Sequence, residues 1–357
     1  MQVARTRIDA ESNRDDPVYP KGAPDPHGGV KDVVPEEDRR KCMTYILKEM
    51  PRDWSSMAFN YTWGNNATLR GASLRLMEYC DLNVSRGFGP ERFGPLSRCL
   101  MLILRRGERH KHRADTDQQV GVWRHRDYLL CSVFSSALLI TYKLKDNNNI
   151  SFKHLNKKKK NLWWILRLIA DKDLDSLYAK MYQNTGVVAP KLTYDRTSAV
   201  QYGGSEGLAP YQIHSLTKHI TDKFHRSYQA EADKEACKVY AGFSKEEAYF
   251  VPRTLLTLPY TIEQYENFLF GDKLVQWRSE ANSPQGDKTV CCDKFLNHII
   301  PYLVEVLVTD GIYFIRVRII LRYFLVTFRT FSLKFLVSHS CFTFSYFFLY
   351  RIFLIMK

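Results

Sequence analysis

The pattern of apolar and polar positions divides the chain into a polar N-terminal segment and a longer segment with regular periodicity. Residues 1–40 are rich in Pro, Gly, Asp and Arg and show little apolar periodicity, which predicts a disordered tail. From Arg39 the pattern becomes helical and continues through Cys42–Glu49, and a second helical stretch includes Ala67–Met77. A folded domain is therefore predicted to start near residue 41.

Two short segments in the middle of the chain have the pattern of paired strands. Arg98–Arg105 (RCLMLILR) is short and apolar, which predicts a buried strand. Gln118–Arg126 (QQVGVWRHR) alternates like a partner strand, and the charged turn Arg106–Asp117 joins the two. Tyr128–Tyr142 then has the pattern of a buried helix. The order helix, β-hairpin, helices predicts a mainly α fold with a small β-hairpin or sheet.

Further helices are predicted after residue 190. A helix-like stretch begins at Arg196 and ends at Gly203-Gly204, and Gly207 provides a break. Another helix is expected from Pro210 to about His219, with Tyr228 on the next one. Arg196 thus precedes His219 by 23 residues, and His219 precedes Tyr228 by nine.

Two segments differ in composition from the rest of the chain. Residues 143–161 are a low-complexity run of Asn and Lys, and residues 313–357 are crowded with Phe, Ile, Leu, Tyr and Arg. Both are biased toward amino acids with A/T-rich codons, which suggests the hypothesis that one or both are translated non-coding sequence. A membrane anchor is the alternative for the tail, but its charge-free run Phe335–Tyr350 is sixteen residues long, short of the ~18–20 that a spanning helix needs.

The chain is basic, and the charge is not confined to its ends. The formal net charge is +14. Residues 1–40 hold nine acidic and seven basic residues, while residues 313–357 hold seven basic residues and no acidic one. About +9 therefore remains on residues 41–312. A basic central segment fits binding to a phosphate backbone.

The eight cysteines do not form a metal-binding or disulfide pattern. They include no C-x-x-C pair, and the adjacent Cys291 and Cys292 cannot chelate zinc as a zinc knuckle does. We interpret them as reduced thiols of a cytosolic or nuclear protein. The N-terminus has no apolar signal-peptide core, so we do not expect secretion.

The segment from Thr193 to Tyr228 resembles the second motif of the tyrosine recombinases. That family has H-x-x-R, a turn containing glycine, a helix, a His or Trp, and a nucleophilic Tyr, with the two spacings found here between Arg196, His219 and Tyr228. Upstream, Thr68–Leu74 (TLRGASL) resembles the first motif, T-G-L-R-x-x-E-L, which places its arginine at Arg70.

Two further blocks extend the resemblance over roughly residues 54–271. The family has a β-hairpin with a catalytic lysine between its motifs, and Lys111 is the only lysine in Arg98–Arg126, although the basic turn there leaves the choice open. The sequence of the predicted hairpin, together with Ala241-Gly-Phe and Tyr249–Arg253 (YFVPR), is similar to the sequences of the Crypton-type recombinases of fungi and oomycetes. Relatives of that group include the centromere-DNA-binding subunit of the budding-yeast kinetochore.

The resemblance implies a role for each matched residue in cutting DNA without a metal or other cofactor. Arg70 and Arg196 would clamp the phosphate and stabilise its transition state, and Tyr228 would attack to form a 3′-phosphotyrosine link. His219 would assist by hydrogen bonding or proton transfer, and Lys111 would protonate the departing sugar oxygen.

One residue departs from the family pattern at the centre of the second motif. Where H-x-x-R has its histidine, this chain has Thr193, which can hydrogen-bond a phosphate but cannot shuttle protons near pH 7. The helical clamp domain that recombinases carry before the first arginine is also largely missing from the predicted fold. Catalysis is therefore left open. The first alternative is a non-catalytic scaffold that binds centromere or chromatin DNA, and the second is a membrane-tethered protein.

These observations predict a nuclear protein that binds double-stranded DNA, associates with itself on DNA and has no membrane partner. The Crypton-type recombinases that the sequence resembles belong to transposable elements and act in DNA integration and recombination. The predicted organisation is a disordered tail (1–40), a tyrosine-recombinase-like DNA-binding domain (41–271, with the low-complexity insert 143–161), a C-terminal extension (272–312) and a hydrophobic basic tail (313–357).

Overall fold

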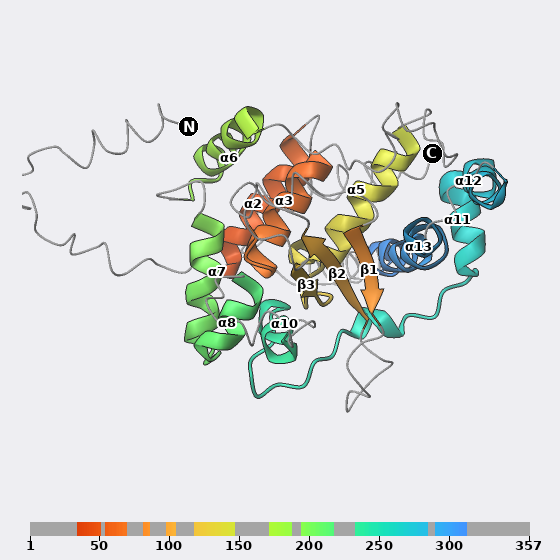
Figure 1. Cartoon of the computed structure of the whole chain (residues 1–357). Coiled ribbons are helices and arrows are strands. Elements are labelled where there is room, and N and C mark those ends of the chain that lie inside the picture. The colour runs from red at the N-terminus through yellow and green to blue at the C-terminus, as the bar shows by residue number, and fades with distance from the viewer. Residues whose placement is uncertain are drawn as a thin grey trace, which may run out of the picture. The chain divides into compact units, whose positions relative to one another are not determined.

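A computed structural model of the chain describes residues 34–50, 54–69, 81–85, 98–104, 118–146, 171–187, 194–217, 233–284 and 290–312 (Figure 1). Within these residues the fold is mainly helical and contains a three-stranded antiparallel sheet, as the sequence predicts.

Helix α2 (Glu36–Glu49) begins three residues before the position that the apolar pattern indicates, inside the segment predicted to be disordered. Its first turn is acidic, with Glu36, Glu37 and Asp38, and Lys48 lies in its last turn, so both ends complement the helix dipole. In addition, Arg40 Nε lies 2.7 Å from Oδ2 of Asp127, a largely buried carboxylate. Charge at the helix start, rather than apolar periodicity, accounts for these extra residues.

Helix α3 (Trp54–Asn66) is buried on every side and was not predicted from the sequence. It packs against α2, against α5 (Ser132–Asp146) and against α7 (Tyr194–Ser205). Two of its side chains are paired with α5 inside the core: Thr62 Oγ1 lies 2.6 Å from Ser135 Oγ, and Trp63 Nε1 donates to Ser136 Oγ at 2.9 Å. Because its polar residues are buried together with its apolar ones, the helix lacks the amphipathic pattern that identifies surface helices.

The chain after α3 differs from its prediction. Ala67–Leu69 are not helical, although the sequence predicts a helix through Ala67–Met77. Thr68 has φ 53°, in the left-handed region, where a helix cannot continue. The rest of that predicted helix lies outside the described residues.

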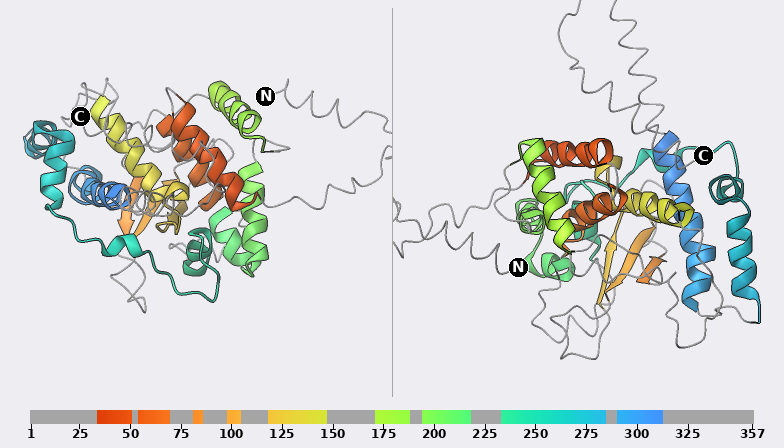
Figure 2. Two further views of the ribbon diagram at one scale, coloured as in Figure 1. Left: turned by 180° about the vertical axis from the view of Figure 1, so that it is seen from behind. Right: turned by 90° about the horizontal axis from the view of Figure 1, so that it is seen from above.

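The sheet contains the predicted hairpin and one further strand. Strands β2 (Cys99–Leu104) and β3 (Gln118–Val122) pair antiparallel, with Leu102 opposite Val120. Strand β1 (Leu82–Ser85), which was not predicted, pairs with the other edge of β2. Figure 2 shows the three strands together on one side of the α3–α5 pair. Both edge strands have helical neighbours, since β1 contacts the π-helical turn η6 (Phe295–Ile299) and β3 contacts α10 (Lys234–Tyr240).

Strand β3 ends at Val122, four residues before the predicted end of the alternating segment. The next carbonyl groups bond to side chains: Tyr249 Oη donates to the carbonyl of Arg124, and Arg253 donates to those of His125 and Arg126. The predicted helix after this segment is confirmed as the short turn η3 (Tyr128–Leu130) followed by α5, which extends to Asp146 and so includes the first residues of the predicted insert.

The helices around Arg196 follow the prediction closely. Helix α7 ends at Ser205, and Gly207 has φ 77°, which a residue without Cβ adopts at little cost. Helix α8 (Pro210–Thr217) ends two residues before His219. Helix α6 (Asp171–Thr185), for which no prediction was made, packs on α2.

The described residues end in three helical segments after the turn η5 (Pro252–Leu255). They are α11 (Ile262–Phe270), α12 (Asp272–Asn282) and a last helix, Cys292–Ile312, which includes most of α13 (Val290–Lys294) and all of η6. Cys292–Ile312 is long and apolar enough to cross a membrane, but 72% of its most apolar stretch is buried within the fold, as in a core helix. The predicted membrane-anchor run Phe335–Tyr350 lies outside the described residues.

Candidate functional site

Most of the residues predicted to act on DNA lie outside the described residues. These are Arg70, Lys111, Thr193, His219 and Tyr228. The backbone of Arg196 is described and lies in the first turn of α7. The structure describes instead what surrounds these positions, together with a buried polar network that the sequence did not predict.

The chain reaches Arg70 through a strained residue. Thr68 is buried and has φ 53°, and among the described residues it is the only one other than glycine with a positive φ. A β-branched residue in this region is an outlier, and such strain costs ~1–3 kcal/mol and clusters at functional sites. Leu69, also buried, is the last described residue before Arg70. Arg70, the predicted first arginine, therefore lies two residues after the buried Thr68, whose backbone conformation is unfavourable.

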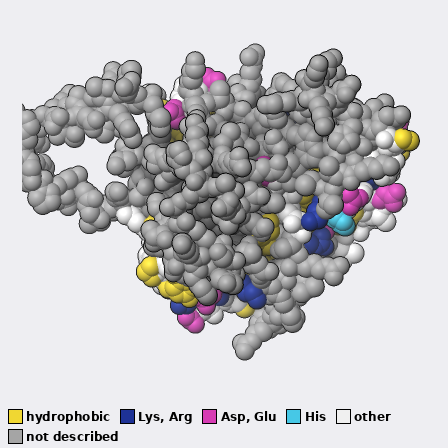
Figure 3. Space-filling model, viewed as in Figure 1, with side chains coloured by type: hydrophobic (Ala, Val, Ile, Leu, Met, Phe, Trp, Pro, Cys, Tyr) yellow, Lys and Arg dark blue, Asp and Glu magenta, His cyan; other side chains and the backbone are white. Residues whose placement is uncertain are grey.

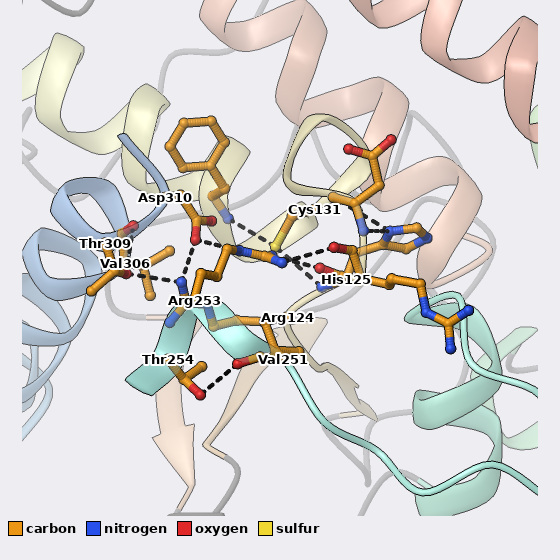
Figure 4. A network of polar contacts seen from close by, with 12 residues as sticks. Arg124, His125, Cys131, Val251, Arg253, Thr254, Val306, Thr309 and Asp310 are labelled. Carbon is orange, nitrogen blue, oxygen red and sulfur yellow. Dashed lines mark hydrogen bonds and ion pairs between the residues drawn. The ribbon is translucent and has the colours of Figure 1, made fainter. Parts of the chain in front are cut away.

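The polar network is centred on Asp310, near the end of the last helix (Figure 4). Its Oδ1 accepts hydrogen bonds from Arg124 Nη2, just after β3, and from Arg253 Nε in η5, the latter at 2.5 Å. Arg124 Nη2 also donates to Thr309 Oγ1 at 2.9 Å. All three charged side chains are almost completely buried, with exposed fractions of 5% for Arg124, 2% for Arg253 and 0% for Asp310. Two buried guanidinium groups therefore share one carboxylate, which balances one of their two positive charges.

Arg253 also fixes the backbone that follows β3. Its Nη1 donates to the carbonyl of Arg126 at 2.9 Å and its Nη2 to the carbonyl of His125 at 2.5 Å. Burial by itself would lower the pKa of Arg124, but the attraction of Asp310 outweighs this and raises that pKa above its ordinary value. Arg124 thus remains a cation, and the network joins the segment after β3, η5 and the last helix.

His125 lies beside this network as a neutral side chain. Burial, followed by repulsion from Arg39 and Arg253, lowers its pKa well below the ordinary value. Its Nδ1 accepts a hydrogen bond from the backbone N–H of Asp127 at 2.9 Å, whereas Nε2 has no hydrogen-bond partner among the described residues. Gly242 packs on the ring: with φ 84°, it could not carry a Cβ, which would lie 2.8 Å from Cε1 of His125.

The sequence contains signals for this network, but they did not identify it. Asp310 is one of two carboxylates, with Glu305, in the apolar segment 302–315 (YLVEVLVTDGIYFI). A carboxylate buried in such a segment requires a cationic partner. Arg124 and Arg253 lie in the two blocks that carry the Crypton-type resemblance. Their pairing through Asp310 could not be predicted, because Asp310 lies 186 and 57 residues away from them.

The network's chemistry is that of a structural support. Its charged groups are enclosed and engage each other and backbone carbonyls, which positions chain segments but exposes no group to a substrate. The side chains of five of the eight cysteines are described, and all five are buried and outside any disulfide: Cys42, Cys99, Cys131, Cys237 and Cys292. Burial raises the pKa of the Cys131 thiol, so this cysteine is protonated and unreactive.

The described surface carries exposed arginines next to carboxylates. In Figure 3, the described Lys and Arg side chains lie in small groups beside Asp and Glu. Arg98 pairs with Glu305, with Nη1 and Oε2 2.8 Å apart, and Arg126 pairs with Glu247. Arg40 likewise pairs with the exposed Glu36, with Nη2 and Oε1 3.2 Å apart.

Comparisons of the chain with protein-family models, with curated proteins and with solved structures found no match. The resemblance to tyrosine recombinases therefore rests on the residues of this sequence alone.

Proposed function

We propose that this protein binds duplex DNA as a tyrosine-recombinase-type domain, with Arg70 and Arg196 on the phosphates. The observation that carries the proposal is the order of Arg70, Arg196, His219 and Tyr228 along the chain. His219 lies 23 positions after Arg196, and Tyr228 lies nine positions after His219. Each residue type is common alone, whereas the order with both spacings is specific to this chemistry.

Local structure around the set is compatible with these roles. Arg196 lies in the first turn of α7, where the helix dipole favours an anion. Helix α8 leads to His219, and the strained Thr68 leads to Arg70. Strands β2 and β3 flank the segment 105–117, which contains Lys111. These features support the proposal, because binding residues are commonly found near the ends of helices and strands.

The helices before Arg70 bear on the proposed domain architecture. A clamp domain closes around DNA from outside the catalytic domain, but α3 is buried against α2, α5 and α7. Together, α2 and α3 belong to the same core as the rest of the described fold. We therefore propose a recombinase-like domain that binds DNA from one side and relies on its net positive charge.

Strand cleavage is a separate step of the proposal, and Thr193 bears on it directly. The family places a histidine there, and a threonine cannot transfer protons near neutral pH. This substitution favours the second function considered, a DNA-binding scaffold that no longer cuts. In both cases the same basic surface holds the duplex.

A nicked suicide DNA substrate distinguishes these functions. In a recombinase, attack by Tyr228 leaves a covalent protein–DNA adduct that is visible after denaturing electrophoresis and absent from Tyr228→Phe. In a scaffold, both proteins bind the DNA in a salt-sensitive manner and neither forms an adduct. If neither protein binds duplex DNA at low salt, the proposal is wrong.

A further inference from the structure

Arg126 is an exposed arginine held in a fixed position beside the buried network. Its guanidinium carbon lies 4.5 Å from the centroid of the Phe243 ring, and its Nη2 donates to Oε1 of Glu247. The two charged side chains are 49% and 42% exposed, so both reach solvent. The ring orients the guanidinium plane, which reduces the entropy lost when it binds a ligand.

The backbone of Arg126 is anchored independently of its side chain. Its N–H donates to the carbonyl of Ala241 at 2.7 Å, and its own carbonyl accepts from the buried Arg253 at 2.9 Å. These bonds remain when the side chain is replaced. A variant at Arg126 therefore changes the surface charge while keeping these backbone hydrogen bonds.

Two cations act on the carboxylate of Glu247. Besides Arg126, the ammonium of Lys238 acts on it, and Lys238 Nζ reaches the carbonyl of Lys245 at 2.5 Å. The backbone N–H of Ser244 donates to Oε2 of Glu247 at 3.3 Å and helps to hold the carboxylate in place. Glu247 thus occupies the position at Arg126 that an external anion would take.

We propose that Arg126 is a phosphate-binding residue for duplex DNA and that a backbone phosphate displaces Glu247 from it. This inference rests on the proposed DNA binding. Exposed ion pairs contribute little stability, so exchanging the carboxylate costs little, and a guanidinium can form two parallel hydrogen bonds to a phosphate. Glu247 then acts as an internal competitor that weakens binding of DNA.

The test measures fluorescence anisotropy of a labelled duplex against the full chain over a series of salt concentrations. Arg126→Gln is expected to weaken binding ~5–10-fold at low salt and to reduce the slope of log K against log [salt] by about 0.9, the contribution of one phosphate. Glu247→Gln is expected to tighten binding ~3–10-fold, a gain that a misfolded protein cannot produce. Arg126→Lys keeps the charge but cannot form two parallel hydrogen bonds to a phosphate, so its affinity for DNA should lie between those of the wild type and Arg126→Gln.

Two matched controls separate a local site from general charge. Arg98 is also exposed, paired with Glu305 and placed 5.3 Å from a tyrosine ring, so Arg98→Gln removes an equivalent charge from a different ion pair. Glu246→Gln removes an exposed acid adjacent in sequence to Glu247. Both controls are expected to change affinity less than ~2-fold, because long-range charge is screened.

The outcomes distinguish this inference from the proposed function. If the wild type binds DNA but Arg126→Gln keeps the full salt slope and Glu247→Gln behaves like Glu246→Gln, the inference alone is overturned. If no protein binds duplex DNA, including Glu247→Gln, both the proposed function and the inference are overturned.

Discussion

Replacing Asp310 tests whether one carboxylate supports two buried cations. Asp310→Asn keeps the shape and an acceptor oxygen but removes the negative charge that faces Arg124 and Arg253. Arg253 keeps its two carbonyl acceptors and Arg124 keeps Thr309 Oγ1, so the guanidinium groups stay hydrogen-bonded. Their charges, however, lose compensation in a site closed to water.

The expected loss is a large part of the stability of a domain. Removing one partner of a buried ion pair costs about 3–5 kcal/mol. Asp310→Asn should lie near the lower value, ~3 kcal/mol, because its amide oxygen can still accept from the guanidinium groups. Asp310→Ala should lie near the upper value, ~5 kcal/mol, because it offers no acceptor. Domains are stable by only ~5–15 kcal/mol in total, so the alanine variant should be close to unfolding.

Urea denaturation followed by far-UV circular dichroism measures these losses, and the same helix offers a control. Glu305→Gln removes the carboxylate of the exposed Arg98–Glu305 pair and should cost less than ~1 kcal/mol. In the background of Asp310→Asn, Arg124→Met should recover part of the loss, since it removes one uncompensated cation. A loss in Asp310→Asn within ~1 kcal/mol of that in Glu305→Gln would refute the argument.

Three further predictions concern single positions, each measured by denaturation of the full chain. In α7, Gly203→Ala should destabilise by ~1–3 kcal/mol, because its Cβ would lie 2.5 Å from the Tyr240 hydroxyl, whereas Gly204→Ala meets open space and should stabilise by ~0.5–1 kcal/mol; equal effects would contradict the packing of this helix. Burial and nearby arginines lower the pKa of His125, so only the unfolded state takes up its proton and stability should fall as the pH drops below ~6.5; a difference between wild type and His125→Gln that is independent of pH would disprove this. Thr261 forms a capping box at α11, and Thr261→Ala should cost ~1 kcal/mol while Thr261→Ser costs less; no loss in the alanine variant would show that the cap contributes nothing.

The elements that the sequence predicts well are those whose pattern reflects local physics. The β2–β3 hairpin follows from an apolar run opposite an alternating one, and the α7–α8 pair follows from helical periodicity interrupted at Gly207. Helix α3 was missed because its polar residues are buried, and two of its side chains, Thr62 and Trp63, pair with serines of α5 that lie 73 residues away. Such pairing is invisible in a window of neighbouring residues.

The candidate site was predictable only in part for the same reason. The spacing along residues 193–228 predicts a phosphate-binding role for Arg196. The residues next to Arg196 in α7 are helical, as expected. The roles of Arg124 and Arg126 depend instead on contacts with Asp310 and Glu247, each more than a hundred residues away. The sequence marks the block around Arg126 as distinctive without showing which of its arginines is buried and which reaches solvent.

The contact between Arg124 and Asp310 also has a consequence for the order of events during synthesis. The two residues are separated by 186 positions, and Arg253 binds the same carboxylate. At translation rates of ~5–20 residues per second, the ribosome needs roughly 10–40 s after Arg124 to add Asp310. During that interval the nascent chain contains first Arg124 and, for the last 57 residues, also Arg253 without their counterion, so we expect this region to need a chaperone until the last helix emerges.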